Sequence, residues 1–293
     1  MMTTRDLTLD SPIKPARADE HAAFVRLIQS RQAQMDRTLP EWARRSNPIV
    51  RRHLGAHWKT IVPDIPQIAR WLALQAGFVA LAIPFPFLFT LLMPAVTVSL
   101  FLLPIALGMY GLGLINVAAM AAETMAAERR NHTLDVLRVA PRPLRHILMS
   151  KMAAAVWRQI EDLNLVMVGV ALLTAPVLIV EYGILFNAQT QPGLTVVAVI
   201  LGMVTSTFRL LVEPIMVGAL GVMLGAITPP IRMSASTLTV VITAGYFALI
   251  NLARLLPLGY IPRILVETVL PFVLPIAIAW VALRVASLAL AQD

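Results

Sequence analysis

Long apolar runs constrain this chain more than any other feature of its sequence. Residues 71–121 contain no charged or histidine side chain, and further apolar runs follow toward the C-terminus. About 20 predominantly apolar residues are enough for a helix to cross a bilayer. We therefore expect an all-α membrane protein. Its six transmembrane helices are expected at about residues 71–93, 96–121, 163–186, 194–227, 235–253 and 264–288.

Composition agrees with a membrane protein. Only 14% of the residues are charged and the mean hydropathy is +0.76, whereas a soluble domain is about 25% charged. The net charge of +8 would suggest nucleic acid in a soluble protein. Here most basic residues flank apolar runs, so we expect contact with anionic lipid headgroups and no nucleic-acid partner. The chain has no cysteine and therefore no disulfide.

A polar, basic stretch at residues 123–151 separates the second expected span from the third. Its lysines and arginines outnumber its acidic residues, and short loops of this kind stay on the cytoplasmic side of the membrane. Apolar residues from Thr133 to Ala140 fall partly at helical spacing. Pro141 and Pro143 then end that pattern. We expect a short amphipathic helix, a proline corner and a second helix that leads into the third span.

This stretch resembles the loop after the second span in the permeases of ABC-2 type transporters. The family pattern is roughly Glu-Arg/Lys-x-x-Gly-Thr-Leu-x-x-Leu, a proline, and then Ile-Leu-x-x-Lys. His132 stands where the family usually has glycine. The matching positions, which the resemblance makes the candidate partner-binding residues, are Glu128, Thr133, Leu134, Leu137, Pro141 and Lys151.

The resemblance implies a function. The chain would be the permease subunit of an ABC exporter in the cytoplasmic (inner) membrane, with both termini in the cytoplasm. It would form half of a dimeric pathway, as a homodimer or a heterodimer. A separate ATP-binding protein, carrying ATP and Mg, would dock on a coupling helix near residues 128–141.

The segments before the first span form two regions. Residues 1–46 are polar, and we expect a solvated, partly disordered cytoplasmic extension. Residues 47–70 are expected to form a basic amphipathic helix in the membrane interface, before a permease domain at 71–290. The helix opens with Asn47-Pro-Ile-Val-Arg-Arg-His53. It is similar to a family segment that usually carries glutamate where His53 stands.

Two charges interrupt the fourth apolar run. Arg209 and Glu213 are four residues apart, so they share a helical face and can pair. Ionisable groups inside membranes mark either pairing partners or pathways, and the sequence leaves a structural pair and a translocation or gating element open. We expect one long or broken helix with a kink at Pro214. The Gly221–Gly225 spacing permits a tight helix crossing.

The sequence lacks the motifs of the common catalytic sites. None of the three lysines, Lys14, Lys59 and Lys151, follows a glycine. The chain therefore has no P-loop, and we expect no enzyme activity and no cofactor of its own. His53 and His57 lack the further ligands of a zinc site, so we expect no metal. Two alternatives are an ion-gradient-driven secondary transporter or channel, and a membrane-embedded enzyme or assembly factor. The former needs more intramembrane carboxylates than Glu213, and the latter needs convergent catalytic residues that the sequence does not show.

Overall fold

A computed structural model describes residues 36–55, 65–82, 85, 87–131, 133, 141–185, 192–228, 234–252, 256, 258, 262 and 265–292. The chain divides into two units, Met1–Pro40 and Glu41–Asp293. All elements considered below belong to the second unit. This boundary places residues 41–46, which we expected in the polar extension, with the helical unit.

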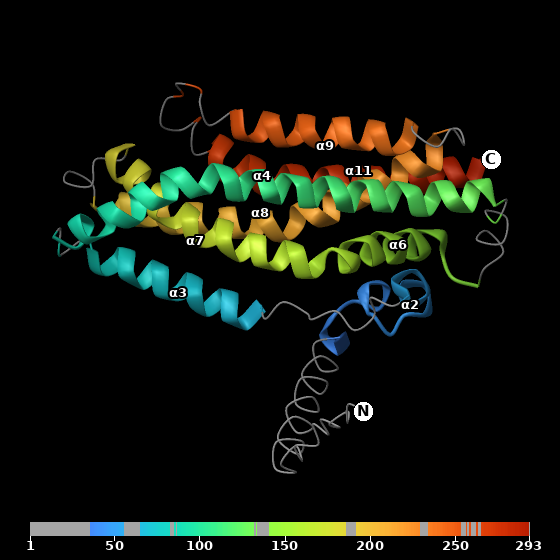
Figure 1. Ribbon diagram of the computed structural model, residues 1–293, viewed down its shortest axis with the longest axis horizontal. Coiled ribbons are helices and arrows are strands. Elements are labelled where there is room, and N and C mark those ends of the chain that lie inside the picture. Colours follow the sequence, from blue (N-terminus) through green and yellow to red (C-terminus); the bar gives the residue numbers. More distant parts are fainter. Residues whose placement is uncertain are drawn as a thin grey trace, which may run out of the picture. The chain divides into compact units, whose positions relative to one another are not determined.

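Every regular element in the described ranges is a helix. In chain order they are η1 (Glu41–Ala43), α2 (Pro48–Leu54), α3 (Ile65–Ala82), α4 (Phe87–Arg130), α6 (Leu144–Arg158), α7 (Ile160–Leu185), α8 (Pro192–Ile227), α9 (Ser234–Leu252), the π-helical turn η4 (Leu265–Val269) and α11 (Leu270–Gln292). Helices α4, α8 and α11 run side by side (Figure 1).

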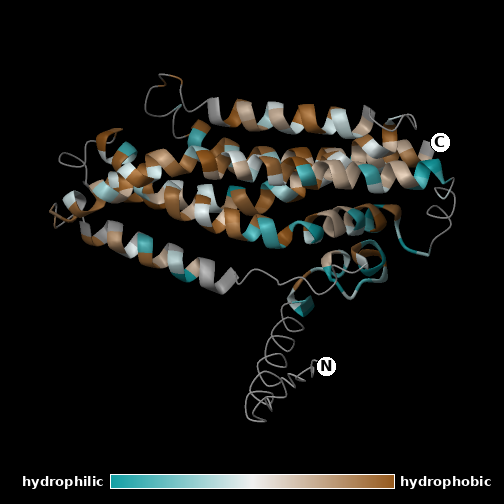
Figure 2. Ribbon diagram, in the orientation of Figure 1, coloured by the Kyte–Doolittle hydropathy of each residue, from teal (hydrophilic) through white to brown (hydrophobic). Residues whose placement is uncertain are grey.

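Several of these helices have the properties of membrane spans. Four are long and apolar enough to cross a bilayer: Thr90–Arg130, Ile160–Leu185, Gly193–Ile227 and Leu265–Ala291. Ala235–Ile250 is a shorter apolar helix. Apolar residues run along the length of these helices (Figure 2). Large apolar side chains such as Phe101 and Leu165 are 75% and 78% exposed, which suits a surface in contact with lipid. The chain is therefore an all-helical protein with the features of a multi-pass membrane protein.

The first two expected spans were placed incorrectly. We predicted helices at 71–93 and 96–121 with a turn at Pro94, but α3 ends at Ala82 and α4 runs unbroken through Pro94 to Arg130. The break coincides instead with Pro84 and Pro86, two prolines in three residues. A single proline removes one helical hydrogen bond, which membrane helices tolerate. At 1.5 Å per residue α4 is roughly 66 Å long, so part of it must lie outside a hydrocarbon core of about 30 Å.

The interface helix is also shorter than predicted. We expected an amphipathic helix over 47–70, but α2 ends at Leu54. Gly55 follows with φ +54°, a left-handed conformation that favours glycine and ends the helix. A new helix, α3, then begins at Ile65, and Pro66 lies in its first turn, where proline is tolerated.

The later helices agree more closely with the sequence. α7, α8 and α9 begin and end within a few residues of the predicted spans, and α8 is one long helix with Pro214 inside it. The last span is longer at its C-terminal end, because η4 and α11 together cover 265–292.

Helices α4 and α8 form the centre of the unit and run parallel. A Cβ atom built on Gly221 would lie 2.8 Å from the Cβ of Ala121, and one on Gly225 would lie 2.8 Å from the Cβ of Met125. Both would also overlap carbonyl oxygens of α4. Only glycine allows this approach, which confirms the predicted tight crossing.

Candidate functional site

Some of the predicted partner-binding residues meet at the C-terminal end of α4. The Lys151 ammonium on α6 lies 2.9 Å from the Glu128 carboxylate. Thr133 donates its hydroxyl to the same carboxylate and to the Glu128 carbonyl oxygen, and its backbone N–H donates to that carbonyl at 3.0 Å. Three of the six predicted residues thus form one internal cluster, which we call the Glu128 clamp.

Lys151 is buried and paired within the Glu128 clamp. Its side chain is 1% exposed, and burial lowers its pKa while the Glu128 carboxylate opposes that shift. A buried ammonium is stable only with a partner. Glu128 and Lys151 therefore hold α4 and α6 together.

A second anchor lies on the other side of the loop. The Arg142 guanidinium pairs with Glu41 at 2.9 Å and contacts the His146 ring at 2.9 Å. Pro141 beside it is exposed. Leu134 and Leu137 lie outside the described residues. The described residues on either side of 134–140 are therefore attached to the rest of the unit, by the Glu128 clamp on one side and by Arg142 on the other.

Helix α2 is fixed to α6 by its N-cap. The Asn47 side-chain oxygen accepts from the Ile49 N–H at 3.0 Å, and its amide nitrogen donates to Ser150 Oγ at 3.1 Å. Asn and a following Pro are favoured at a helix start. Val50 and Leu54 are fully buried, so this face of α2 packs on protein, whereas we expected an amphipathic helix in the membrane interface.

His53 of α2 lies close enough to the Glu128 clamp for the charges of Lys151 and Glu128 to act on it. Burial, followed by the positive charge of Lys151, lowers its pKa from 6.5 to about 4. Its imidazole is therefore neutral at physiological pH.

The end of α4 also holds the end of α8. Arg129 Nη1 donates to the carbonyl oxygens of Ala226 at 2.8 Å and Thr228 at 3.0 Å. The last carbonyls of a helix lack internal partners and carry partial negative charge, so a guanidinium there stabilises the terminus. Arg129 was not among the predicted site residues, although the sequence showed a basic residue at the end of a long helix.

Deeper in the apolar region, Arg209 and Glu213 form the expected ion pair. The distance from Arg209 Nε to Glu213 Oε1 is 2.5 Å. Tyr246 of α9 donates its hydroxyl to the same carboxylate oxygen at 2.9 Å. Glu213 is fully buried and Arg209 is 5% exposed. The other carboxylate oxygen of Glu213 has no hydrogen-bond partner among the described residues.

A tyrosine satisfies the carbonyl that Pro214 leaves free. Proline has no N–H to donate to the carbonyl four residues earlier, which is that of Leu210. Tyr110 of α4 donates its hydroxyl to the Leu210 oxygen at 3.2 Å. Tyr110 is fully buried, so α4 supplies the hydrogen bond that α8 lacks.

The sequence analysis did not single out Glu267. This carboxylate lies in the π-helical turn η4, is 6% exposed and accepts a hydrogen bond from the Tyr182 hydroxyl at 2.6 Å. Single π-helical turns occur frequently at functional sites. The sequence signal that could have identified Glu267 is an acidic residue inside an apolar run.

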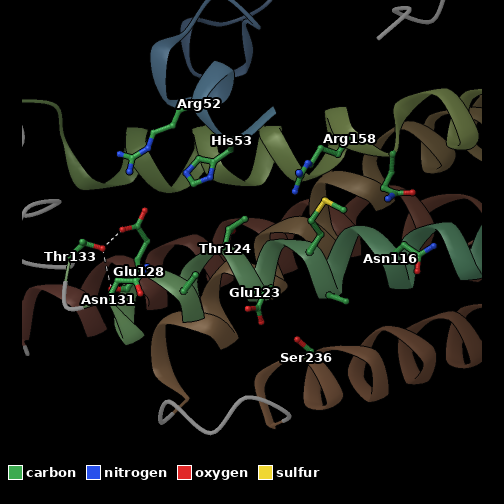
Figure 3. Close-up of a pocket in the computed structure, with 14 residues that line it drawn as sticks. Arg52, His53, Asn116, Glu123, Thr124, Glu128, Asn131, Thr133, Arg158 and Ser236 are labelled. Carbon is green, nitrogen blue, oxygen red and sulfur yellow. Dashed lines mark hydrogen bonds between the residues drawn. The ribbon is translucent and has the colours of Figure 1, made fainter. Parts of the chain in front are cut away.

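A cavity of about 970 Å³ opens beside the Glu128 clamp (Figure 3). Helix α4 forms one wall with Glu123 and Glu128, while Arg52 and His53 of α2 and Arg158 at the end of α6 lie across from it. The start of α9 also contributes. In the described part of the chain, no group of three His, Asp or Glu side chains is arranged to hold a metal ion.

Comparisons with protein-family models, with curated proteins and with solved structures return no match to this chain.

Proposed function

We propose that this chain is the membrane-spanning permease subunit of an ABC exporter of the ABC-2 type. It crosses the cytoplasmic membrane six times, with α3 and α9 completing the set, and both termini lie in the cytoplasm. Two such subunits, identical or related, form the pathway. A separate subunit supplies ATP hydrolysis, with its Mg, and docks on the loop between α4 and α6.

The observation that carries this proposal is the Glu128 clamp. Glu128, Thr133 and Lys151 belong to the motif that resembles the family, and they join the loop to two helices at once. A loop that transmits force needs rigid attachment at its ends. The clamp and the Arg142 anchor provide attachment on both sides of residues 134–140.

The attachments define a route for movement. Displacement of residues 134–140 by a nucleotide-binding partner acts on α4 through Glu128 and on α6 through Lys151. Arg129 extends the effect to the end of α8. Because ATP binding can drive the change only by binding one state more tightly, the partner must favour one arrangement of these helices.

Affinity purification from the native membrane tests the proposal. We expect a stoichiometric partner with a Walker A motif, lost in Leu137→Asp and retained in the matched control Leu137→Met, which keeps the apolar contact. Glu128→Gln should retain the partner but uncouple its ATP hydrolysis from transport. A chain that purifies without any nucleotide-binding protein, under conditions that preserve a known ABC complex, contradicts the proposal.

One observation favours the alternative of an ion-gradient-driven transporter. Glu267 adds a second buried carboxylate to Glu213, and one Glu213 oxygen accepts no hydrogen bond from the described residues. Acidic residues within membrane helices mark ion pathways in transporters. In that case a protonophore would abolish transport while ATP depletion at constant proton gradient would not. The ABC proposal predicts the reverse.

A further inference from the structure

The cavity beside the Glu128 clamp has an excess of positive charge. Its two carboxylates are compensated by bases outside the lining, because Glu123 pairs with Arg130 and Glu128 pairs with Lys151. Arg52 and Arg158 also line it, and both are exposed. No ion pair with either of these two arginines is found among the described residues.

Both arginines act on the same part of the cavity. Burial and the charge of Lys151 lower the pKa of His53 most, and the charges of Arg52 and Arg158 add to this effect; His53 lies between these two arginines in the lining. His53 is therefore neutral and can donate or accept a hydrogen bond without changing the local charge. Arg52, His53 and Arg158 together present two cations and one neutral ring to the cavity (Figure 3).

The remaining lining is suited to an oxyanion. Asn131 and Gln159 contribute amides and Ser236 contributes a hydroxyl, so neutral donors accompany the two guanidiniums. Guanidinium groups bind phosphate through paired N–H donors, which is stronger and more directional than an ammonium contact.

We infer that this cavity binds a phosphate group, with Arg52 and Arg158 as its principal ligands. The cavity shares Glu128 and Thr133 with the proposed partner-binding residues, but Arg52 and Arg158 are not among them. The inference therefore does not depend on an ATP-binding partner. Two sources supply such a group: the headgroup of an anionic glycerophospholipid, or free phosphate.

The shape of the cavity favours the lipid source. Its α4 wall extends from Asn116 to Glu128, which is roughly 18 Å at 1.5 Å per residue. Between Glu123 and Asn116 this wall carries the apolar side chains of Met120 and Ala119. A ligand with a charged head and an apolar chain can place the chain against these two residues, whereas free phosphate cannot use them.

Binding to the purified full-length chain in detergent tests the inference. The probes are dioctanoyl phosphatidylglycerol, dioctanoylglycerol, which has the same chains without phosphate, and inorganic phosphate. Arg52→Gln and Arg158→Gln should each weaken phosphatidylglycerol binding about tenfold. Arg51→Gln is the matched control: Arg51 is also exposed on α2 but does not line the cavity, and its affinity should stay within about twofold of the wild type.

The outcomes separate the two sources. Displacement of the lipid by inorganic phosphate shows that the phosphate group alone is recognised; tight binding of phosphatidylglycerol without such competition shows that the acyl chains contribute as well. Both results support the site, provided that the two arginine variants are weakened. Equal binding of dioctanoylglycerol and phosphatidylglycerol overturns the inference. So does wild-type affinity in Arg52→Gln and Arg158→Gln variants that show an unchanged thermal unfolding midpoint.

Discussion

The Glu128–Lys151 ion pair gives the most specific prediction about the loop between α4 and α6. Replacing Glu128 with Gln leaves an ammonium that is 1% exposed without its partner charge. Replacing Lys151 with Met leaves a carboxylate that is 15% exposed in the same position. The double variant Glu128→Leu with Lys151→Met removes both charges and fills the same space with apolar side chains.

The expected losses in the free energy of unfolding follow from the geometry of the ion pair. At 2.9 Å the attraction is about 6 kcal/mol for an effective dielectric constant of roughly 20. Much of this offsets desolvation, so breaking a buried pair on one side costs about 3–5 kcal/mol, whereas replacing both partners is often close to neutral. We expect each single variant to lower the free energy of unfolding by about 3 kcal/mol, and the double variant to lie within about 1 kcal/mol of the wild type.

Thermal and denaturant unfolding in detergent measure these differences as a double-mutant cycle. In Glu128→Gln the folded state should favour neutral Lys151, so its pKa stays below the unfolded value. The unfolded state then binds more protons, and stability should rise as pH increases toward about 10. Additive losses in the two single variants, with no recovery in the double variant, would refute the assignment of a buried, coupled pair.

Three further predictions concern the helix packing and pH. Gly225→Leu should disrupt the α4–α8 crossing, because its side chain would overlap the Ala122 carbonyl, and unfolding in detergent should show a loss of several kcal/mol. Tyr110→Phe should lower stability by about 1–3 kcal/mol in the same assay, because the Leu210 carbonyl loses its donor. His53 is protonated in the unfolded state near pH 6.5 but in the folded state only near pH 4. Stability should therefore fall as pH drops from 6.5 toward 4, and His53→Gln should reduce that slope.

Each of these has a control in the chain. Gly245 of α9 has open space around it, so Gly245→Leu should leave the unfolding midpoint nearly unchanged. A similar loss at Gly245 and Gly225 would mean that the loss is not specific to the α4–α8 crossing. An acid slope identical in wild type and His53→Gln would show that other groups set the pH dependence. A Tyr110→Phe variant as stable as the wild type would mean that the Leu210 carbonyl does not need the tyrosine.

Features that depend on local pattern could be predicted from the sequence. The apolar runs placed α7, α8 and α9 correctly, because length and hydropathy decide whether a segment suits the bilayer. The pairing of Arg209 with Glu213 follows from helical spacing. The close packing at Gly221 and Gly225 follows from the absence of a side chain.

Features that depend on competition between similar signals could not be predicted. We placed the turn between the first two spans at Pro94 and expected Pro84 and Pro86 only to bend the first span, whereas α4 continues through Pro94 and Pro104. Gly55 ended α2 early, although the apolar residues beyond it continued the helical pattern.

The candidate site was predictable only in part. The motif placed Glu128, Thr133 and Lys151 in one loop region, but their mutual contacts join residues 23 apart in the chain, which no local pattern reveals. The hydrogen bond from Tyr182 to Glu267 joins residues 85 apart in the chain, so it could not be predicted for the same reason.

A single introduced cysteine provides the most direct test of the docking proposal, because the chain contains no cysteine of its own. Cysteine at Leu137 should form a crosslink, in native membranes, to a protein with a Walker A motif. Cysteine at Leu165, which is 78% exposed on an apolar helix, should not form that crosslink. A crosslink to a nucleotide-binding protein from Leu137 alone is the result that the account predicts. No such crosslink from Leu137, or equal crosslinking from both positions, would contradict it.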